Sequence, residues 1–421
     1  MSAPDGRRPA HDTSEAPPAR SRAGTSATAP DGRRPAHDTS EAPPARSRAG
    51  RSATAILDLP PDAASAALAE WLAARREAPY RLSQLLPRLW QRPVAAWAEA
   101  TELPAALRRA LDAEWPLPRL ALETSQESRD GTRKMLWRLP DGEAIESVLI
   151  PEGTRRTLCI SSQAGCPLRC AFCATGRMGL RRNLAAWEIA GQVRELLLAA
   201  EPVKPTNVVF MGMGEPLLNW AAVDVALTLL NHPAALGIGA RHLTVSTVGI
   251  LPALASLAKR PEQFRLAISL HAPTSQVRRA IMPIEKRYPL PEVLEAIKTF
   301  RRRVTFEYVL IEGVNDRDED LAALARIAKR GGALVNLLPL HPGGAGDLVA
   351  ASRHRLAWFA GALKARGVEA VARRSRGLDI SAACGQLRVE RGDVGGEVAP
   401  EPDRDVHQAS GIGELPDHAD A

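Results

Sequence analysis

Strand-like and helix-like stretches alternate about six times in the middle of the chain, and this alternation constrains the fold more than any other feature. The strand-like stretches are continuous apolar runs, and the helix-like stretches carry apolar residues on one face. Such strands are typical of a parallel sheet covered by helices. Six units predict an α/β fold built on a partial (βα)6 barrel. The predicted strands are 157–161, 207–211, 243–246, 266–270, 304–310 and 334–338, and the predicted helices are 185–200, 221–231, 251–258, 291–301, 321–329 and 352–366.

Polar residues follow several of these strands at the point where each strand ends. In barrels of parallel strands, the chemistry takes place at the carboxyl ends of the strands. Each residue alone has an ordinary interpretation, such as a solvated carboxylate or a packed histidine. Their common position predicts one shared site, formed by Gly214, Glu215, Ser246, Ser269, His271 and His341.

The loop after the first predicted strand holds Cys166, Cys170 and Cys173 at Cys-x3-Cys-x2-Cys spacing. Iron–sulfur clusters are normally held by four Cys thiolates. Three thiolates leave one iron of a four-iron cluster open, which is the arrangement that lets S-adenosylmethionine (SAM) bind the cluster and be cleaved to a radical. A structural zinc site is the competing interpretation, but it needs four ligands, usually in two pairs. The chain has no second Cys pair, so the spacing favours the cluster.

Two further cysteines stand outside this group. Cys159 lies seven residues before Cys166, and Cys384 stands alone near the C-terminus. A lone cysteine is usually a small buried apolar residue. Spacing alone therefore assigns neither residue a role.

The two ends of the chain differ in composition from the body. Residues 3–28 recur as residues 29–54 with one difference, Thr25 against Arg51. This segment is rich in Pro, Arg and Ser and lacks large apolar residues, which predicts disorder over residues 1–55. An acidic stretch rich in Gly and Pro predicts a disordered tail over 388–421. Between them we predict a helical accessory domain at 56–132, with helices at 64–74, 82–90 and 104–115, and then a β-ribbon at 134–139 and 144–150 that leads into the barrel, the two together spanning 133–387.

The charge distribution suits a polyanionic partner. The net charge is +7, but residues 1–55 carry +3 and residues 388–421 carry −6, so the body between them reaches +10. A basic body is typical of proteins that bind nucleic acid. No apolar run approaches the length of a membrane span, and we find no apolar core of a signal peptide. Clustered thiols in such a chain predict a cytoplasmic location without membrane contact.

Taken in order, the motifs between residues 57 and 387 resemble the RlmN/Cfr family of radical SAM RNA methyltransferases. The resemblance implies a radical SAM barrel and methylation of an adenine ring carbon. For the RlmN branch it implies C2 of adenine in large-subunit rRNA and in tRNA. The motifs are Cys159-Ile-Ser-Ser-Gln-Ala-Gly-Cys166, Cys170-Ala-Phe-Cys173-Ala-Thr-Gly, Arg182-Asn183-Leu184, Gly212-Met-Gly-Glu-Pro-Leu-Leu-Asn219, Val245-Ser-Thr, Ser269-Leu-His-Ala272 and Ala383-Cys384-Gly-Gln-Leu387.

The same resemblance implies roles for individual residues. The cluster thiols would hold a [4Fe–4S] cluster, and two molecules of SAM would be used per turnover. Cys384 would carry a methyl group, and Cys159 would attack the sulfur of Cys384 to form a transient disulfide that frees the product. Glu146 would accept the proton from the adenine ring. Contacts to SAM are implied at Gly214, Glu215, Ser246, Ser269, Leu270, His271 and His341.

The resemblance also implies partners, namely rRNA and tRNA as substrates, a flavodoxin-type electron donor and a monomeric enzyme. One departure concerns His341-Pro342, where many relatives have Asn-Pro. Phosphate contacts would come from arginines that flank the cysteine motifs. These are Arg155, Arg156, Arg177, Arg181, Arg182, Arg373, Arg374 and Arg376.

Two alternative functions remain open at this stage. The Cfr branch methylates C8 of adenine and shares all the cysteines named above. A non-catalytic RNA-binding protein with a structural metal site would also be basic. That second alternative gives no reason for Cys159 and Cys384 to accompany the cysteine loop.

Overall fold

The computed structural model describes residues 55–341 and 347–387. Residues 1–54 of the predicted N-terminal repeat and the predicted acidic tail at 388–421 lie outside the described residues. Within the described ranges, no helix is both long enough and apolar enough to span a bilayer.

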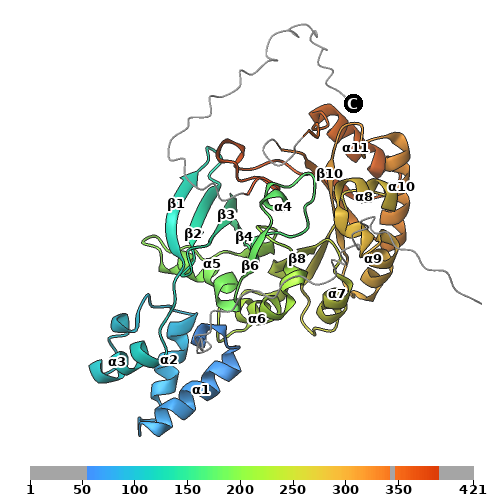
Figure 1. The fold of residues 1–421 in the computed structure, drawn as a ribbon. Helices are drawn as coiled ribbons and strands as arrows, with labels where there is room; N and C mark the ends of the chain where they lie inside the picture. The colour runs from blue at the N-terminus through green and yellow to red at the C-terminus, as the bar shows by residue number, and fades with distance from the viewer. Residues whose placement is uncertain (1–54, 342–346, 388–421) are drawn as a thin grey trace, which may run out of the picture. The chain divides into compact units, whose positions relative to one another are not determined.

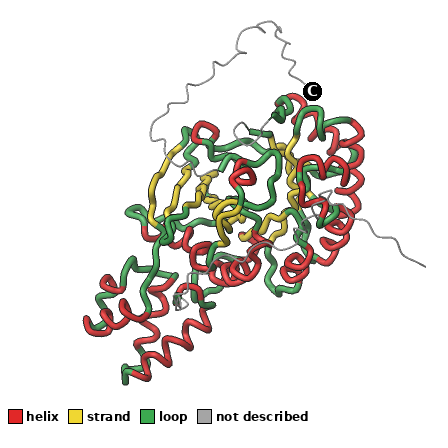
Figure 2. Tube along the Cα trace, in the orientation of Figure 1, coloured by secondary structure: helices red, strands yellow, loops and turns green. Residues whose placement is uncertain are grey.

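A ten-stranded sheet forms the centre of the fold, with the strand order β1-β2-β3-β4-β7-β8-β9-β10-β11-β12. The strands from β4 to β12 pair in parallel and form the inner layer, with helices outside it (Figure 2). The six predicted strands are present within two residues of their expected bounds, and a short seventh strand follows the last helix. The parallel strands are β4 (Arg155–Cys159), β7 (Asn207–Phe210), β8 (Leu243–Thr247), β9 (Arg265–Ser269), β10 (Thr305–Leu310), β11 (Leu334–Pro339) and β12 (Ala370–Ala372).

An antiparallel extension continues the sheet beyond β4. The predicted ribbon corresponds to β2 (Arg133–Arg138) and β3 (Ala144–Glu152), and β3 pairs with β4. A third strand, β1 (Ala121–Glu127), pairs with β2, although the sequence pattern places this stretch in the helical region. All seven residues of β1 are exposed, so it has no apolar alternation by which a strand is recognised.

In the described part of the chain, seven helices cover the outside of the parallel strands (Figure 1). α10 shows why such a segment is helical. Leu321, Leu324 and Ala328 are buried on one face, three acidic residues stand in its first turn, and Gly332 ends it at φ +57°. The seven helices are α5 (Ala186–Leu198), α6 (Trp220–Asn231), α7 (Leu251–Ala258), α8 (Ser275–Ile281), α9 (Leu290–Ala296), α10 (Asp318–Gly331) and α11 (Arg353–Ala365).

Within residues 55–120, the α-helices that precede the sheet are α1 (Pro61–Ala74), α2 (Arg81–Leu89) and α3 (Ala105–Glu114), as the helical pattern of that region predicts. They are tied to α5 by a buried arginine. Arg194 donates hydrogen bonds to the backbone oxygens of Leu89 at 2.9 Å and Val94 at 2.7 Å. Burial of Arg194 lowers its pKa to about 10, so the guanidinium remains charged at neutral pH and both bonds are charge-assisted.

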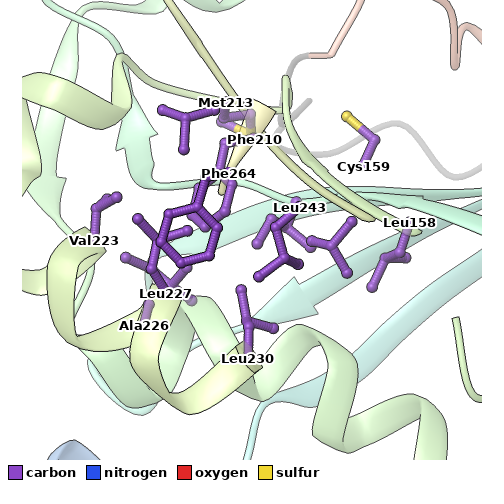
Figure 3. Close-up of a cluster of buried hydrophobic side chains, with 14 of the residues drawn as sticks. Leu158, Cys159, Phe210, Met213, Val223, Ala226, Leu227, Leu230, Leu243 and Phe264 are labelled. Carbon is purple, nitrogen blue, oxygen red and sulfur yellow. The ribbon is translucent and has the colours of Figure 1, made fainter. Parts of the chain in front are cut away.

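The core between α6 and the sheet fixes the position of Cys159. Leu227 and Leu230 of α6 pack with Leu158 of β4 and Leu243 of β8, as Figure 3 shows. Successive residues of a strand point to opposite faces. Cys159 therefore lies on the other side of β4 from Leu158, away from the packed leucines (Figure 3).

Candidate active site

A cavity opens at the carboxyl ends of the parallel strands, where the sequence predicts the site. Its volume is about 1050 Å³, including space that is open to solvent. Ten of the thirteen predicted site residues line it, and Cys159, Glu146 and Leu270 do not. The ten lining residues are Cys166, Cys170, Cys173, Gly214, Glu215, Ser246, Ser269, His271, His341 and Cys384.

The cysteine loop is enclosed by a small two-stranded ribbon, β5 (Gln163–Gly165) and β6 (Leu180–Asn183), and contains the short helix α4 (Ala174–Met178). Gly165 has φ +79°, and a Cβ on it would lie 1.9 Å from the backbone oxygen of Gly179. The next residue, Cys166, donates its N–H to the same oxygen at 3.0 Å. The ribbon thus closes so tightly that only glycine fits beside the first of the three cysteines.

The three thiols form one electrostatic group. Burial raises the pKa of Cys166 to about 12, and the neighbouring Cys173 adds to this rise. Burial and the two neighbouring thiols likewise raise the pKa of Cys170. Because the thiolates repel one another, positive charge is required to ionise them together.

These residues fit an iron–sulfur cluster. Across residues 55–341 and 347–387, no three His, Cys, Asp or Glu side chains gather closely enough to hold a single metal ion. In a four-iron cluster each thiolate binds a different iron, so the ligands spread around a larger group. Three free thiols along one cavity wall, with Cys166 and Cys170 buried and Cys173 half-buried, provide such a spread set of ligands.

Glu215 is held in the cavity wall by three donors. Its Oε1 accepts from Thr247 Oγ1 at 2.6 Å and from Leu217 N at 3.0 Å, and its Oε2 accepts from Val248 N at 3.0 Å. Burial raises the pKa of Glu215 to about 7 despite these hydrogen bonds. A carboxylate has about four acceptor positions, so one remains for an ammonium group in the cavity.

The end of β9 places the second group of predicted contacts. Ser246 Oγ and Ser269 Oγ lie 3.4 Å apart on neighbouring strands. Leu270 is fully buried, and its N–H donates to the backbone oxygen of Glu307 at 3.0 Å. Its side chain is therefore part of the hydrophobic core. A ligand contact at this position would have to come from its backbone.

His271 adopts a left-handed conformation, φ +51°, which is unusual for a residue other than glycine. Val309 N donates to its Nδ1 at 3.1 Å, and burial lowers the pKa of His271 to about 3. The ring is therefore neutral and carries its proton on Nε2. Its centroid lies 4.6 Å from that of Phe172 in the cysteine loop, edge to face. His271 thus links the end of β9 to the cysteine loop.

Cys384 reaches the cavity from the C-terminal segment. The residue is exposed and lies in the cavity wall together with the three cysteines of the loop. Cys159 is buried at the end of β4, where burial raises its pKa and the charge of Cys384 raises it further. An electrostatic effect of this kind requires the two thiols to be close. Both are free cysteines in the structure.

Glu146 is buried in β3, although a solvated position is the usual expectation for a glutamate in a β-ribbon. Lys134 Nζ lies 3.4 Å from its Oε1. Its backbone is tied to the loop after β7, because Ser161 Oγ donates to Glu146 O at 2.6 Å and accepts from Met213 N at 2.9 Å. Glu146 therefore lies next to the strand that ends at Cys159 but outside the cavity lining.

Two polar residues of the cavity region are not among those predicted from the sequence. Glu307 lines the cavity, and Asn336 on the neighbouring strand donates from Nδ2 to Glu307 Oε1 at 2.9 Å. Burial raises the pKa of Glu307. A signal was present in the sequence, because Glu307 is the only charged residue of its strand and Asn336 is the only polar residue of an otherwise apolar strand.

One predicted phosphate contact is engaged elsewhere. Arg182 donates to both oxygens of Glu188, at 2.7 and 2.8 Å, and also pairs with Asp141. These bonds fasten β6 to the start of α5 and to the β2–β3 turn. Arg182 is therefore a structural residue in this conformation.

Comparisons with known proteins identify the family of the chain. Residues 160–325 match the family model of the radical SAM superfamily. The chain is 57% identical over 354 residues to the "Probable dual-specificity RNA methyltransferase RlmN" of Gemmatimonas aurantiaca, covering 84% of this chain and 98% of that protein. It is 46% identical over 336 residues to the "Dual-specificity RNA methyltransferase RlmN" of an Anaeromyxobacter species, covering 77% and 89%.

A solved structure shows the same fold. The radical SAM methyltransferase from Sphaerobacter thermophilus superposes with a TM-score of 0.74 at 41% identity, covering 80% of this chain and 99% of that protein. The relatives are matched over nearly their full length, and the three-cysteine loop lies within the matched superfamily region. The chain belongs to the RlmN family of radical SAM methyltransferases.

Proposed function

We propose that this protein is a SAM-dependent RNA methyltransferase that methylates C2 of an adenine in large-subunit rRNA and in tRNA. The observation that carries the proposal is the meeting of Cys384 with Cys166, Cys170 and Cys173 in one cavity. The names of the relatives support RNA as the substrate. The basic body of the chain suits an RNA partner.

Cys166, Cys170 and Cys173 would hold a [4Fe–4S] cluster, and Glu215 would bind the ammonium group of SAM with its remaining acceptor position. When bound, the cluster supplies the electron that cleaves SAM to a 5′-deoxyadenosyl radical. Ser246, Ser269, His271 and His341 line the remaining wall and would orient the cofactor. Their fixed positions at strand ends keep that orientation constant.

Cys384 carries the methyl group in this proposal. Its thiol gives up a proton and takes a methyl group from one SAM, which would leave as S-adenosylhomocysteine. That methyl group would then give up a hydrogen atom to the 5′-deoxyadenosyl radical from a second SAM, forming 5′-deoxyadenosine, and its carbon would add to the adenine ring. The adduct would return one electron before the ring proton leaves. Glu146 accepts the ring proton. Cys159 then attacks the sulfur of Cys384, so that a disulfide forms and the methylated base is released. The electrostatic coupling of the two thiols supports this pairing.

The substrate base must leave its stack to reach a cavity at the strand ends, as in other enzymes that modify bases. Arg373 follows β12 and affects the pKa of Cys384, so its guanidinium lies near the proposed carrier. It is therefore the strongest candidate for a phosphate contact among the predicted arginines. We also propose that the electron donor is a flavodoxin-type protein and that the enzyme is a monomer.

The decisive experiment is mass spectrometry of nucleosides after anaerobic turnover with rRNA fragments and with tRNA. The proposal expects 2-methyladenosine from both RNAs with the wild-type protein. Formation of 8-methyladenosine would instead assign the chain to C8 chemistry. A reconstituted protein that contains zinc and no iron, and gives no methylated nucleoside, would favour the non-catalytic RNA-binding alternative.

His341→Asn is expected to keep wild-type affinity for SAM, and His341→Ala is expected to weaken it about 2- to 10-fold, the equivalent of one hydrogen bond. His341 lines the cavity, its Nε2 lies 3.3 Å from Ser375 Oγ, and burial lowers its pKa. The ring is neutral, and an amide can replace its single donor or acceptor. Equilibrium dialysis with SAM checks this, and unchanged affinity in His341→Ala would show that the side chain makes no contact.

A further inference from the structure

The turn between β1 and β2 holds the segment that leads to the C-terminal thiol, although the two lie about 250 residues apart. Ser128 Oγ donates to Asp379 Oδ1 at 2.5 Å, and Arg129 N donates to Asp379 Oδ2 at 3.2 Å. In return, Gly377 N donates to Asp130 Oδ2 at 3.1 Å. Each segment thus supplies a carboxylate that binds the backbone of the other. We call this group of five residues the hairpin clamp.

The two carboxylates of the clamp are ionised at neutral pH. Burial would raise the pKa of Asp130, but hydrogen bonds from Thr132 and Gly377 lower it to about 2. The hydroxyl of Ser128 lowers the pKa of Asp379. Hydrogen bonds to ionised acceptors are stronger than those between neutral groups. Both carboxylates of the clamp are exposed, and both remain ionised acceptors at physiological pH.

The segment is packed closely against the turn. Gly377 has φ +61°, and a Cβ on it would lie 2.9 Å from Thr132 Cγ2 and 2.8 Å from Ala382 Cβ. Ala382 N donates back to Gly377 O at 2.9 Å. Between them Ser381 has φ +50°, a strained value for a residue other than glycine. The clamp therefore holds a tight loop that ends two residues before the thiol.

A second attachment holds the chain on the other side of the thiol. Ala174 N donates to Gly385 O at 2.8 Å, and Thr175 Oγ1 donates to Leu387 O at 2.6 Å. Both donors belong to α4, which directly follows Cys173. Cys384 thus lies between two anchored segments, one bonded to α4 and the other to the hairpin clamp. Cys384 itself takes part in neither set of hydrogen bonds.

We propose that the hairpin clamp positions Cys384 so that its methyl group meets the reactive carbon of cleaved SAM. This inference rests on the proposed function. Asp130, Asp379 and Ser128 are positioning residues, since none of them lines the cavity. Loosening the clamp leaves SAM cleavage intact but lets the methyl group drift from its partner. Displacement of about 1 Å can cost on the order of 100-fold in rate.

The test measures coupling, which a merely structural residue would not change. In one anaerobic reaction, 5′-deoxyadenosine and methylated adenosine are quantified for Ser128→Ala, Ser128→Thr and Asp379→Asn. The ratio of 5′-deoxyadenosine to methylated adenosine should rise about tenfold or more in Ser128→Ala and Asp379→Asn. Ser128→Thr keeps a hydroxyl and should restore the wild-type ratio. Asp112→Asn, an exposed change on α3, serves as the control.

Iron content and melting temperature are recorded for every variant. A wild-type ratio in Ser128→Ala and Asp379→Asn, with or without a lower melting temperature, would overturn the positioning role. If Asp379→Asn does not fold, Ser128→Ala still decides, because it removes a single hydroxyl. If Cys384→Ala retains methylation, the proposed function itself fails. If Cys384→Ala is inactive but the ratio is unchanged in the clamp variants, only the inference about the clamp fails.

Discussion

Cys384→Ala is expected to give no methylated adenosine and no RNA adduct, whereas Cys159→Ala is expected to accumulate RNA joined covalently to the protein. Without Cys384 the cysteines that remain in the cavity lining are the three proposed cluster ligands, so none is free to carry the methyl group. Without Cys159 the adduct forms, but no thiol releases it. The two thiols are close enough for Cys384 to raise the pKa of Cys159. Even so, loss of Cys384 should stop the reaction before the adduct forms, and loss of Cys159 should stop it after the adduct has formed.

Denaturing gels after anaerobic turnover distinguish the two failures. The Cys159→Ala protein should show a slow band that disappears after nuclease treatment. The double variant Cys159→Ala/Cys384→Ala is the control, and it should show no slow band, because the adduct requires the carrier. Equal behaviour of the two single variants, with neither adduct nor product, would contradict the proposed division of roles.

Gly165→Ala is expected to prevent normal cluster loading. The left-handed backbone costs alanine about 1–2 kcal/mol, and the Cβ would lie 1.9 Å from the backbone oxygen of Gly179. That oxygen also accepts the N–H of Cys166. Because backbone cannot rotate away as a side chain can, the ribbon must shift and carry the first cysteine with it. Overpacking of this kind costs about 1–3 kcal/mol more.

Iron and sulfide per chain after anaerobic reconstitution measure this effect. Gly142→Ala is the matched control, since Gly142 has φ +88° and, apart from Gly142 and its two chain neighbours, no described residue has an atom within 4 Å of the point that a Cβ would occupy. Gly142→Ala has the same cost of a left-handed backbone but no clash, so this variant should load iron normally. Normal loading in Gly165→Ala would show that the β5–β6 ribbon tolerates displacement.

The parallel strands were predictable because continuous apolar runs occur only where both faces are covered. The same physics explains two omissions. β1 is held by pairing with β2 alone and exposes every residue, so it leaves no apolar pattern. β12 has three residues, of which only Ala370 is buried, and is too short for periodicity. Both strands are defined by pairing with another strand, β1 with β2 and β12 with β11, and not by a pattern in their own sequences.

The candidate site also contains residues that local sequence predicts and residues that only the tertiary fold brings together. The three cluster cysteines are close in sequence, so their spacing predicted a common ligand. Their meeting with Cys384 depends on the topology of the whole chain, and only the family resemblance suggested it in advance. The burial of Glu146 was not foreseen, because the covering of β3 by the loop after β7 is a tertiary contact.

The two bonds from α4 to the C-terminal segment make cluster loading and the seating of Cys384 linked equilibria. Ala174 and Thr175 directly follow the last cluster ligand and also hold Gly385 and Leu387. Linkage is reciprocal, so whatever orders one site strengthens the other by the same free energy. A variant in which Thr175 cannot hold Leu387 would therefore bind a cluster less firmly than the wild-type protein.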